Sequence, residues 1–262
     1  MTEKVEEQLS MFKEWFRKQP HFPKKIDDIL IVRFLHSCYY DVENAKKTAN
    51  KFFEMRATCP DLFANRDPTG PDIQNAIQFS KMAQYSIAGN KFLWIWQIDD
   101  PGLQRYNATH EAKLSALATD CWLLVEQNLE ESDIVLVDAK HMSFRILMKL
   151  NLSLSKAQVK YYEEAMPFRM NQIHFVNCPP ILSRIFSIYK TFVKPEVTER
   201  ICFHLPNSET LFEYINKDDL PKDLGGNRES MEYFTKLAIE RIMDKREILL
   251  DDSYWISCDK NK

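Results

Sequence analysis

The segment MNQIHFVNCPPILSRIFSIYKTFVKPEVTERICFHL, residues 170–205, decides the fold. Its two ends, 170–177 and 199–205, are short, apolar and rich in β-branched and aromatic residues, so each predicts a strand. Between them, residues 178–195 carry apolar side chains at the i, i+3 and i+4 spacing of a helix, with prolines at both ends. About 15 helical residues extend only ~22 Å, too short to cross a bilayer. The segment therefore predicts strand, helix, strand.

The residues before this segment repeat the same alternation. Residues 91–99, KFLWIWQID, and 133–138, DIVLVD, predict two further strands, and the second has the continuous β-branched composition of a strand buried on both faces. Helical patterns cover 110–130, 142–150 and 153–165. Alternating strands and helices imply right-handed crossovers, so the sequence predicts an α/β fold with a mainly parallel sheet.

The chain begins and ends with helical patterns. Three helices are predicted within residues 1–75, and the turn-rich RDPTGPD at 66–72 marks a boundary after them. A charged helix is predicted near 229–247. We therefore divide the chain into an N-terminal helical subdomain (1–75), an α/β domain (76–228) and a C-terminal helix and tail (229–262).

Composition excludes two large function classes. The 262 residues are 45% hydrophobic and 28% charged, an ordinary globular balance, and the net charge of −3 argues against a nucleic-acid partner. Only five glycines are present, and no G-x-G-x-x-G or G-x-x-x-x-G-K-[ST] motif can be formed from them. Dinucleotide-binding and P-loop enzymes are therefore disfavoured.

The cysteine pattern favours a reducing compartment. Six cysteines are scattered without a C-x-x-C pair, and the first residues lack the apolar core of a signal peptide. We expect free thiols and a cytoplasmic protein. No run approaches the roughly 20 apolar residues of a membrane span.

Motifs for catalysis and metal binding are weak. The sequence has no G-x-S-x-G, H-x-x-x-H or H-E-x-x-H. Cys202 and His204 share one face of a predicted strand and could hold a metal, but two ligands do not make a site. Asp138 ends a strand where α/β active sites gather, with a capping or turn role as the alternative. We predict no catalytic residues, no metal and no cofactor other than a bound cargo.

The sequence has more large apolar residues than an ordinary sheet needs. Alternation along 92–98 places Phe92, Trp94, Trp96 and Ile98 on one face of the strand and Leu93 and Ile95 on the other, so both faces must be covered. A well-filled core is one explanation. The alternative is an apolar cavity for a lipid, covered by the helix at 178–195.

Several motifs together resemble one known family. DDILIVRFLHSCYYDVENAKK (27–47) is similar to the N-terminal helical segment of CRAL-TRIO proteins, and RDPTG (66–70) recurs in members. The strongest match is IHFVNCPPILSRIFSIYKTFVKPEVTERICFH (173–204), followed by LPKDLGGN (220–227). The chain resembles the tocopherol-transfer and retinaldehyde-binding branch of CRAL-TRIO proteins over about residues 26–230.

This resemblance implies a sheet that floors a pocket for one hydrophobic ligand, which would be tocopherol-, retinoid-, carotenoid- or otherwise lipid-like. It identifies the helix at 178–195 as a mobile gate. The gate stripe would be Leu182, Phe186, Tyr189 and Val193. The pocket wall would comprise Leu117, Cys121, Val135, Val137, Tyr161, Tyr162, Met166, Phe168, Met170 and Ile173.

Two details of the family pattern concern polar residues. Relatives of this type place small hydroxyl residues near positions 117 and 121, where this chain has leucine and cysteine. They also carry a basic phosphoinositide-binding cluster beside the gate, and Arg169 and Arg200 stand at matching positions, whereas Cys38, Asn171 and Glu196 do not match. Lys190 and Lys194 add cations that could attract an anionic membrane. Favourable charge at a helix C-terminus is the alternative role for these lysines.

We therefore expect a monomeric, non-enzymatic carrier that transfers one hydrophobic ligand between membranes through its gate and associates peripherally with them. A regulatory or interaction module with a collapsed pocket is the first alternative, and a membrane phosphoinositide sensor is another. An enzyme acting on the ligand, with Asp138 or a pocket tyrosine, is a third class.

Overall fold

A computed structural model describes residues 3–256 of the chain. A five-stranded sheet forms its centre, in the order β1-β2-β3-β4-β5. The strands are β1 (Ser80–Ile87), β2 (Lys91–Ile98), β3 (Ser132–Asp138), β4 (Met170–Val176) and β5 (Ile201–Phe203). The α-helices are α1 (Glu3–Lys18), α2 (Asp28–Ser37), α3 (Val42–Thr58), α4 (Pro60–Phe63), α5 (Pro71–Ile77), α6 (Ala108–Val125), α7 (Phe144–Lys149), α8 (Leu152–Glu164), α9 (Leu182–Tyr189), α10 (Pro195–Thr198), α11 (Met231–Asp244), α12 (Arg246–Leu249) and α13 (Asp252–Trp255). Short 3₁₀ helices are η1 (Thr210–Glu213), η2 (Lys217–Asp219) and η3 (Lys222–Leu224).

Strands β2 to β5 run parallel, which confirms the predicted α/β class with a mainly parallel sheet. Strand β1 was not predicted from the sequence. It pairs antiparallel with β2 through a hairpin whose turn contains Gly89 at φ 80° and Asn90 at φ 57°. Both residue types tolerate the left-handed backbone that a tight hairpin turn requires.

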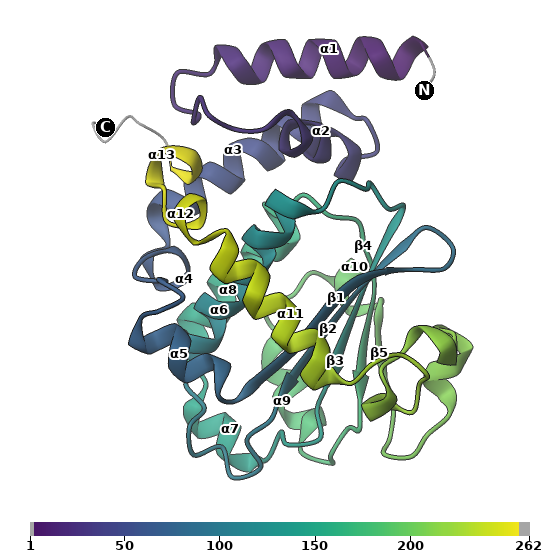
Figure 1. Cartoon of the computed structure of the whole chain (residues 1–262). Helices are drawn as coiled ribbons and strands as arrows, with labels where there is room; N and C mark the ends of the chain where they lie inside the picture. The colour runs from purple at the N-terminus through teal and green to yellow at the C-terminus, as the bar shows by residue number, and fades with distance from the viewer. Residues whose placement is uncertain (1–2, 257–262) are drawn as a thin grey trace.

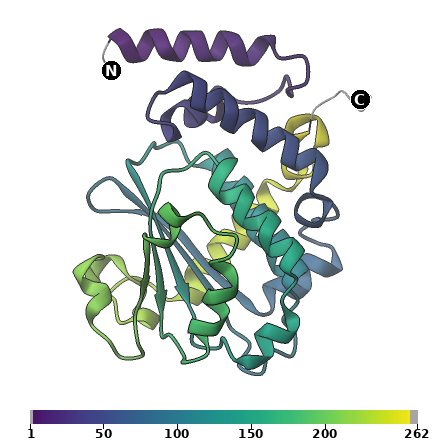
Figure 2. The same ribbon diagram turned by 180° about the vertical axis from the view of Figure 1, so that it is seen from behind.

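Both faces of the sheet are covered, as the apolar residues on either side of β2 predict. Leu93 and Ile95 belong to a core on one face with Met231 of α11. Phe92 and Ile98 belong to the larger core on the other face. Figure 1 shows α11 crossing the sheet face turned to the viewer, and Figure 2 shows α8 and α9 on the opposite side.

The N-terminal helices and the C-terminal segment pack together at one end of the sheet (Figure 1). An aromatic core that includes Phe16, Phe22 and Phe53 joins α1 to α3. The C-terminal segment reaches this region through hydrogen bonds from Arg246 to the carboxylate of Asp67, at 2.6 and 2.9 Å. Helices α12 and α13 thus pack at the same end of the sheet as the N-terminal helices.

A buried ionic cluster ties this end to the domain below. Asp120 of α6 is fully buried and pairs with the guanidinium groups of Arg56 and Arg66. Burial opposes ionisation of Asp120, but the two arginines outweigh it, and the pKa of its carboxyl is lowered. Arg56 also stacks over the rings of Phe52 and Trp255. One carboxylate therefore connects α3, α6 and the C-terminal segment.

Residues 178–195 do not form the single long helix that periodicity predicted. Helix α9 ends at Tyr189, a turn follows, and α10 begins at Pro195. The proline holds the preceding residue, Lys194, in an extended conformation with ψ 144°, so the helix cannot continue into it. Val193 therefore lies in the turn between the two helices.

Membrane spans and disulfides were also expected to be absent. No helix in residues 3–256 is long and apolar enough to cross a membrane. Five cysteines carry free thiols in this part of the chain, whereas Cys258 lies outside the described residues.

Candidate ligand cavity

A cavity of about 380 Å³ lies between the sheet and the helices on the face that Figure 2 presents. The sheet forms its floor, α6 and α8 form its walls, and α9 with the turn after it forms its cover. Most lining side chains are apolar or aromatic, and the polar ones are Gln84, Glu111, Ser115, Thr119, Ser155, Gln158 and Glu163. The volume falls within the range of sites that take a small hydrophobic molecule.

The floor is built by alternation along neighbouring strands. Trp94 and Trp96 of β2 and Val135 and Val137 of β3 face the cavity, two residues apart in each strand. Strand β4 departs from this alternation, because the pairing of β3 and β4 shifts register after Asp133. The irregularity lets both Met170 and Ile173 line the cavity, although they are three residues apart.

The structure brings together seven of the ten pocket residues that the resemblance implied. They are Val135, Val137, Tyr162, Met166, Phe168, Met170 and Ile173. Leu117, Cys121 and Tyr161 lie elsewhere, and those three assignments need correction.

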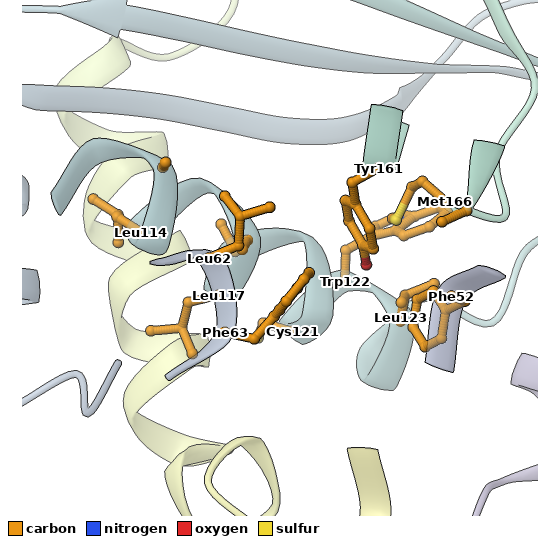
Figure 3. Packing of buried hydrophobic residues seen from close by; sticks show 14 of the residues in the cluster. Phe52, Leu62, Phe63, Leu114, Leu117, Cys121, Trp122, Leu123, Tyr161 and Met166 are labelled. Carbon is orange, nitrogen blue, oxygen red and sulfur yellow. The ribbon is translucent and has the colours of Figure 1, made fainter. Parts of the chain in front are cut away.

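Leu117 and Cys121 occupy the wrong face of α6 to line the cavity. The residues of α6 that reach the cavity are Glu111, Ser115 and Thr119, each four positions from the next. Positions 117 and 121 are displaced by two residues and point to the far side of the helix. Figure 3 shows them beside Leu62 and Phe63, in the core between α4 and α6.

Tyr161 is held in the core by its hydroxyl and its ring. The hydroxyl accepts a 3.0 Å hydrogen bond from the buried guanidinium of Arg56, and the ring packs against Phe52 and Phe63. The adjacent Tyr162, one position further around α8, faces the cavity instead. Tyr161 therefore belongs to the core, and Tyr162 belongs to the cavity wall.

Relatives of the type that the sequence resembles have small hydroxyl residues near positions 117 and 121, and this chain has them two positions earlier on α6. Ser115 and Thr119 are small hydroxyl residues on the cavity wall. The hydroxyls of Ser115 and Tyr162 are 2.7 Å apart, and Thr119 donates to the carbonyl of Ala116. Burial raises the pKa of Tyr162 to about 12, so its hydroxyl stays protonated and can act as a donor.

The cover of the cavity contains all four predicted gate residues. Leu182, Phe186 and Tyr189 line the cavity from α9, and Val193 lines it from the turn that follows. Phe186 meets the ring of Phe203 of β5 edge to face, with centroids 5.0 Å apart. The predicted stripe is thus a continuous inner face of the cover.

Few polar contacts fasten this cover to α8. The hydroxyl of Tyr189 lies 3.0 Å from the Ser155 hydroxyl. At the other end, the backbone N–H of Lys194 donates to Glu163 at 3.1 Å, and its ammonium lies 3.2 Å from Glu164. Most of the remaining contact between cover and cavity is apolar.

Glu111 is a cavity residue that the sequence analysis did not identify. It lies in the first turns of α6 and faces the apolar cavity. Burial raises the pKa of its carboxyl to about 7, and the Trp96 indole offsets that rise only in part. The indole Nε1 of Trp96 is buried and reaches hydrogen-bond geometry with no described atom. The signal available in the sequence was a glutamate within the mostly apolar helical pattern at 110–130.

The basic residues assigned to a membrane or phosphoinositide surface do not form one cluster. Arg169 is 6% exposed; its guanidinium donates to the carbonyl of His36 at 2.7 and 2.9 Å and pairs with Glu131. Lys194 is paired with Glu164. Lys190 and Arg200 remain exposed. The donors of Arg169 are therefore occupied and do not face a lipid headgroup. Specific phosphoinositide binding stays a prediction.

The other candidate chemical groups lie away from the cavity. His204 contacts His174 across β4 and β5 at 2.9 Å, on the sheet face opposite the cavity floor. Burial lowers the pKa of His174 to about 4, so the pair is neutral at physiological pH. Asp138 accepts hydrogen bonds from Gln97, Asn177 and the backbone of Lys140, which gives it a structural role. Within residues 3–256, no group of three or more His, Cys, Asp or Glu could hold a metal ion.

Residues 97–226, which span most of the cavity, match the CRAL/TRIO domain. The chain belongs to the CRAL/TRIO family. Residues 1–73 match a second family, described as a Pinta-like UBA domain. The domain boundaries predicted from the sequence remain predictions.

Several known proteins resemble the chain along most of its length. Clavesin-1 of Xenopus laevis is 26% identical over 207 residues, which cover 77% of this chain and 61% of the relative. The alpha-tocopherol transfer protein-like protein of Mus musculus is 23% identical over 220 residues, covering 83% and 64%. Clavesin-2 of Homo sapiens is 23% identical, covering 77% and 62%. The chain thus matches less than two thirds of the length of these relatives.

A solved structure agrees with the fold. The crystal structure of Sfh5 superposes with a TM-score of 0.55 at 12% identity and covers 94% of this chain and 98% of that one. This likeness, with the match to the CRAL/TRIO domain, confirms the predicted CRAL-TRIO fold.

Proposed function

We propose that this chain binds one hydrophobic small molecule in the cavity beneath α9 and transfers it between membranes. The observation that carries this proposal is an apolar cavity of about 380 Å³ covered by a short helix. Family membership supports binding and transfer of lipids in general. A volume of this size without a ligand would be costly in a packed core, where voids larger than a water molecule are few.

Helix α9 is the gate in this proposal. It has only eight residues, prolines flank the segment that contains it, and few polar bonds fasten it to α8. Its inner face carries Leu182, Phe186 and Tyr189, which contact water when the gate opens in solution. Exposure of such a patch favours the closed state in water, whereas a bilayer would accept the same residues. Opening and membrane contact are therefore coupled.

A second apolar surface beside the cavity supports membrane contact. Phe144 and Met148 of α7 and Leu152 at the start of α8 are 58%, 71% and 46% exposed. They are spaced four residues apart, and Ile146 between them lines the cavity. Monomeric proteins seldom expose large apolar side chains together without a partner. We infer that this surface, the α7 surface, enters the membrane interface beside the gate.

A transfer assay between vesicles tests the proposal. The purified chain is added to donor vesicles that carry the neutral apolar fluorophore diphenylhexatriene and to acceptor vesicles that quench it. We expect transfer at a rate proportional to protein concentration. The control is Val193→Asp, which places a charge inside the cover and should abolish transfer. Transfer no faster than in the absence of protein, or equal rates for both chains, would contradict the proposal.

A further inference from the structure

Glu111 is an unusual group for the wall of an apolar cavity. A buried carboxylate is normally paired with a cation or bound by several hydrogen-bond donors. Within the described residues Glu111 forms no salt bridge, and no lysine or arginine contributes to its pKa. The only donor that does contribute is the indole of Trp96 on the cavity floor. The carboxyl therefore lacks the partner that its burial calls for.

Three tyrosines from three different segments feel the charge of this carboxyl. Tyr106 precedes α6, Tyr162 lies on α8, and Tyr189 lies on the gate helix α9. Burial raises the pKa of each hydroxyl, and the charge of Glu111 raises it further. Tyr189 places the gate helix among the neighbours of Glu111. Within residues 3–256, none of the three hydroxyls is hydrogen-bonded to Glu111, and those of Tyr162 and Tyr189 contact Ser115 and Ser155.

Trp96 is the second group without a partner at this point. Its Nε1–H is buried and makes no hydrogen bond to a described residue, although the side chain lines the cavity. An indole can only donate, and an ionised carboxylate can only accept. The indole lies close enough to Glu111 to lower the pKa of its carboxyl, but its Nε1–H does not reach hydrogen-bond geometry, so a group between the two meets one donor and one acceptor.

We propose that Glu111 and Trp96 bind a hydroxyl group at one end of the hydrophobic cargo. This inference rests on the proposed carrier function and names the chemical class of its ligand, a lipophilic alcohol or phenol. The hydroxyl donates its proton to the carboxylate of Glu111 and accepts the Nε1–H of Trp96. The rest of the molecule lies among the apolar side chains of the floor and the gate.

Other headgroups satisfy the pair less completely. An ammonium group can only donate, so it leaves Trp96 without a partner and must itself be buried. An ether, ester or aldehyde can only accept, so it leaves the ionised Glu111 without a donor. A carboxylate is repelled by Glu111. Among these headgroups, only the hydroxyl group carries both functions on one atom.

Three probes with the same hydrocarbon chain test this assignment: cetyl alcohol, its methyl ether and cetylamine. Each displaces diphenylhexatriene from the protein at pH 8, where the Glu111 carboxyl is mostly ionised. The fluorophore has no polar group, so its binding reports on the cavity alone. We expect the alcohol to bind about tenfold more tightly than the ether, as a hydrogen bond to a charged acceptor provides.

Variants separate the two partners. Glu111→Leu should remove the preference for the alcohol while the protein still binds the fluorophore, whereas Glu111→Gln keeps an acceptor oxygen and should keep most of the preference. Trp96→Phe should weaken the alcohol and the ether alike, because both accept from Nε1. Thr109→Val is the matched control. It also replaces a polar residue of α6, but Thr109 does not line the cavity and its replacement should change nothing.

The outcomes also separate this inference from the proposed function. If diphenylhexatriene fails to bind the unmodified chain, the cavity does not take a hydrophobic ligand and the carrier proposal fails. If the fluorophore binds but the alcohol and the ether compete equally, the hydroxyl assignment alone is wrong. Tighter binding of cetylamine than of cetyl alcohol, or an unchanged preference in Glu111→Leu, also overturns it.

Discussion

The hydroxyl groups of Ser155 and Tyr189 lie 3.0 Å apart and form the hydrogen bond that joins the gate helix to α8. Both residues line the cavity, so this bond closes the site at the boundary between wall and cover. A neutral hydrogen bond contributes about 1 kcal/mol, a small barrier compared with the apolar contacts of the gate. It is well suited to adjust the rate of opening without fixing the gate shut.

Removing this bond should speed ligand release. We expect Tyr189→Phe to raise the dissociation rate of bound diphenylhexatriene by about fivefold, measured by stopped-flow fluorescence. Ser155→Ala should have a similar effect, and the double variant should equal either single one, because both remove the same bond. Ser187→Ala on the outer face of α9 is the control. Strictly additive effects of the two changes would contradict a shared latch.

A charge on the inner face of the gate should impair retention of the ligand. Phe186 packs against Phe203, and Phe186→Asp would bury an unpaired carboxylate under the closed gate. We expect loss of ligand binding by at least tenfold with cooperative thermal unfolding preserved. Ser187→Asp introduces the same charge on the exposed face and should bind ligand normally. Equal ligand affinity in the two variants would show that α9 does not cover the site.

The α7 surface should control membrane contact rather than ligand affinity. Replacing Phe144 and Met148 together with aspartate removes exposed apolar area and adds negative charge. We expect several-fold weaker sedimentation with anionic vesicles and slower transfer, with unchanged ligand affinity in solution. Tyr233→Asp/Met243→Asp alters exposed apolar residues of α11, across the sheet, and should behave like the unmodified chain. A vesicle-binding defect shared by both double variants would contradict a localised surface.

The Glu111 carboxyl should make the ligand-free protein less stable as pH rises. Its pKa is near 7 in the folded chain, above its ordinary value of 4.5, because burial favours the protonated form. The folded state therefore binds more protons, and stability falls between about pH 4.5 and 7. Urea unfolding at both ends of this range should show a smaller fall for Glu111→Gln, by 1–3 kcal/mol. The same pH dependence in both chains would argue against a buried carboxyl.

The Asp120 cluster should dominate the stability of the N-terminal helices. Asp120→Ala leaves the buried guanidinium groups of Arg56 and Arg66 without their shared counter-ion. We expect a loss of about 3–5 kcal/mol in the free energy of unfolding, measured by urea denaturation. Asp28→Ala removes an exposed carboxylate paired with Lys13 and Arg17, and should cost less than about 1 kcal/mol. Comparable losses would mean that the buried cluster contributes no more than a surface pair.

The sequence predicts the sheet well where strands are buried on both faces. A continuous β-branched run identifies β3 with little ambiguity, and the alternation of strands with helices gives the parallel topology. Strand β1 carries polar residues such as Lys81 and Gln84 among its apolar ones, so its pattern is weak. It is a strand because the turn at Gly89 and Asn90 returns the chain along it.

The site shows where sequence reasoning ends. Helix α6 is buried on nearly all sides, so its apolar pattern does not indicate which face meets the cavity. The resemblance assigned Leu117 and Cys121 to the pocket wall, two positions away from Ser115 and Thr119, which line the cavity. Arg169 could be recognised as basic, but only the fold shows that the carbonyl of His36 and the carboxylate of Glu131 occupy its donors. Glu111 carried no motif at all.

The most direct test of the carrier account is the lipid content of the protein itself. The chain is incubated with a membrane lipid extract, re-purified and extracted with organic solvent, and the extract is quantified by mass spectrometry. We predict close to one hydrophobic molecule per chain, with a hydroxyl group at one end, and its loss in Phe186→Asp. Repeated recovery of no bound lipid from the unmodified chain would contradict the central claim that the cavity holds a cargo.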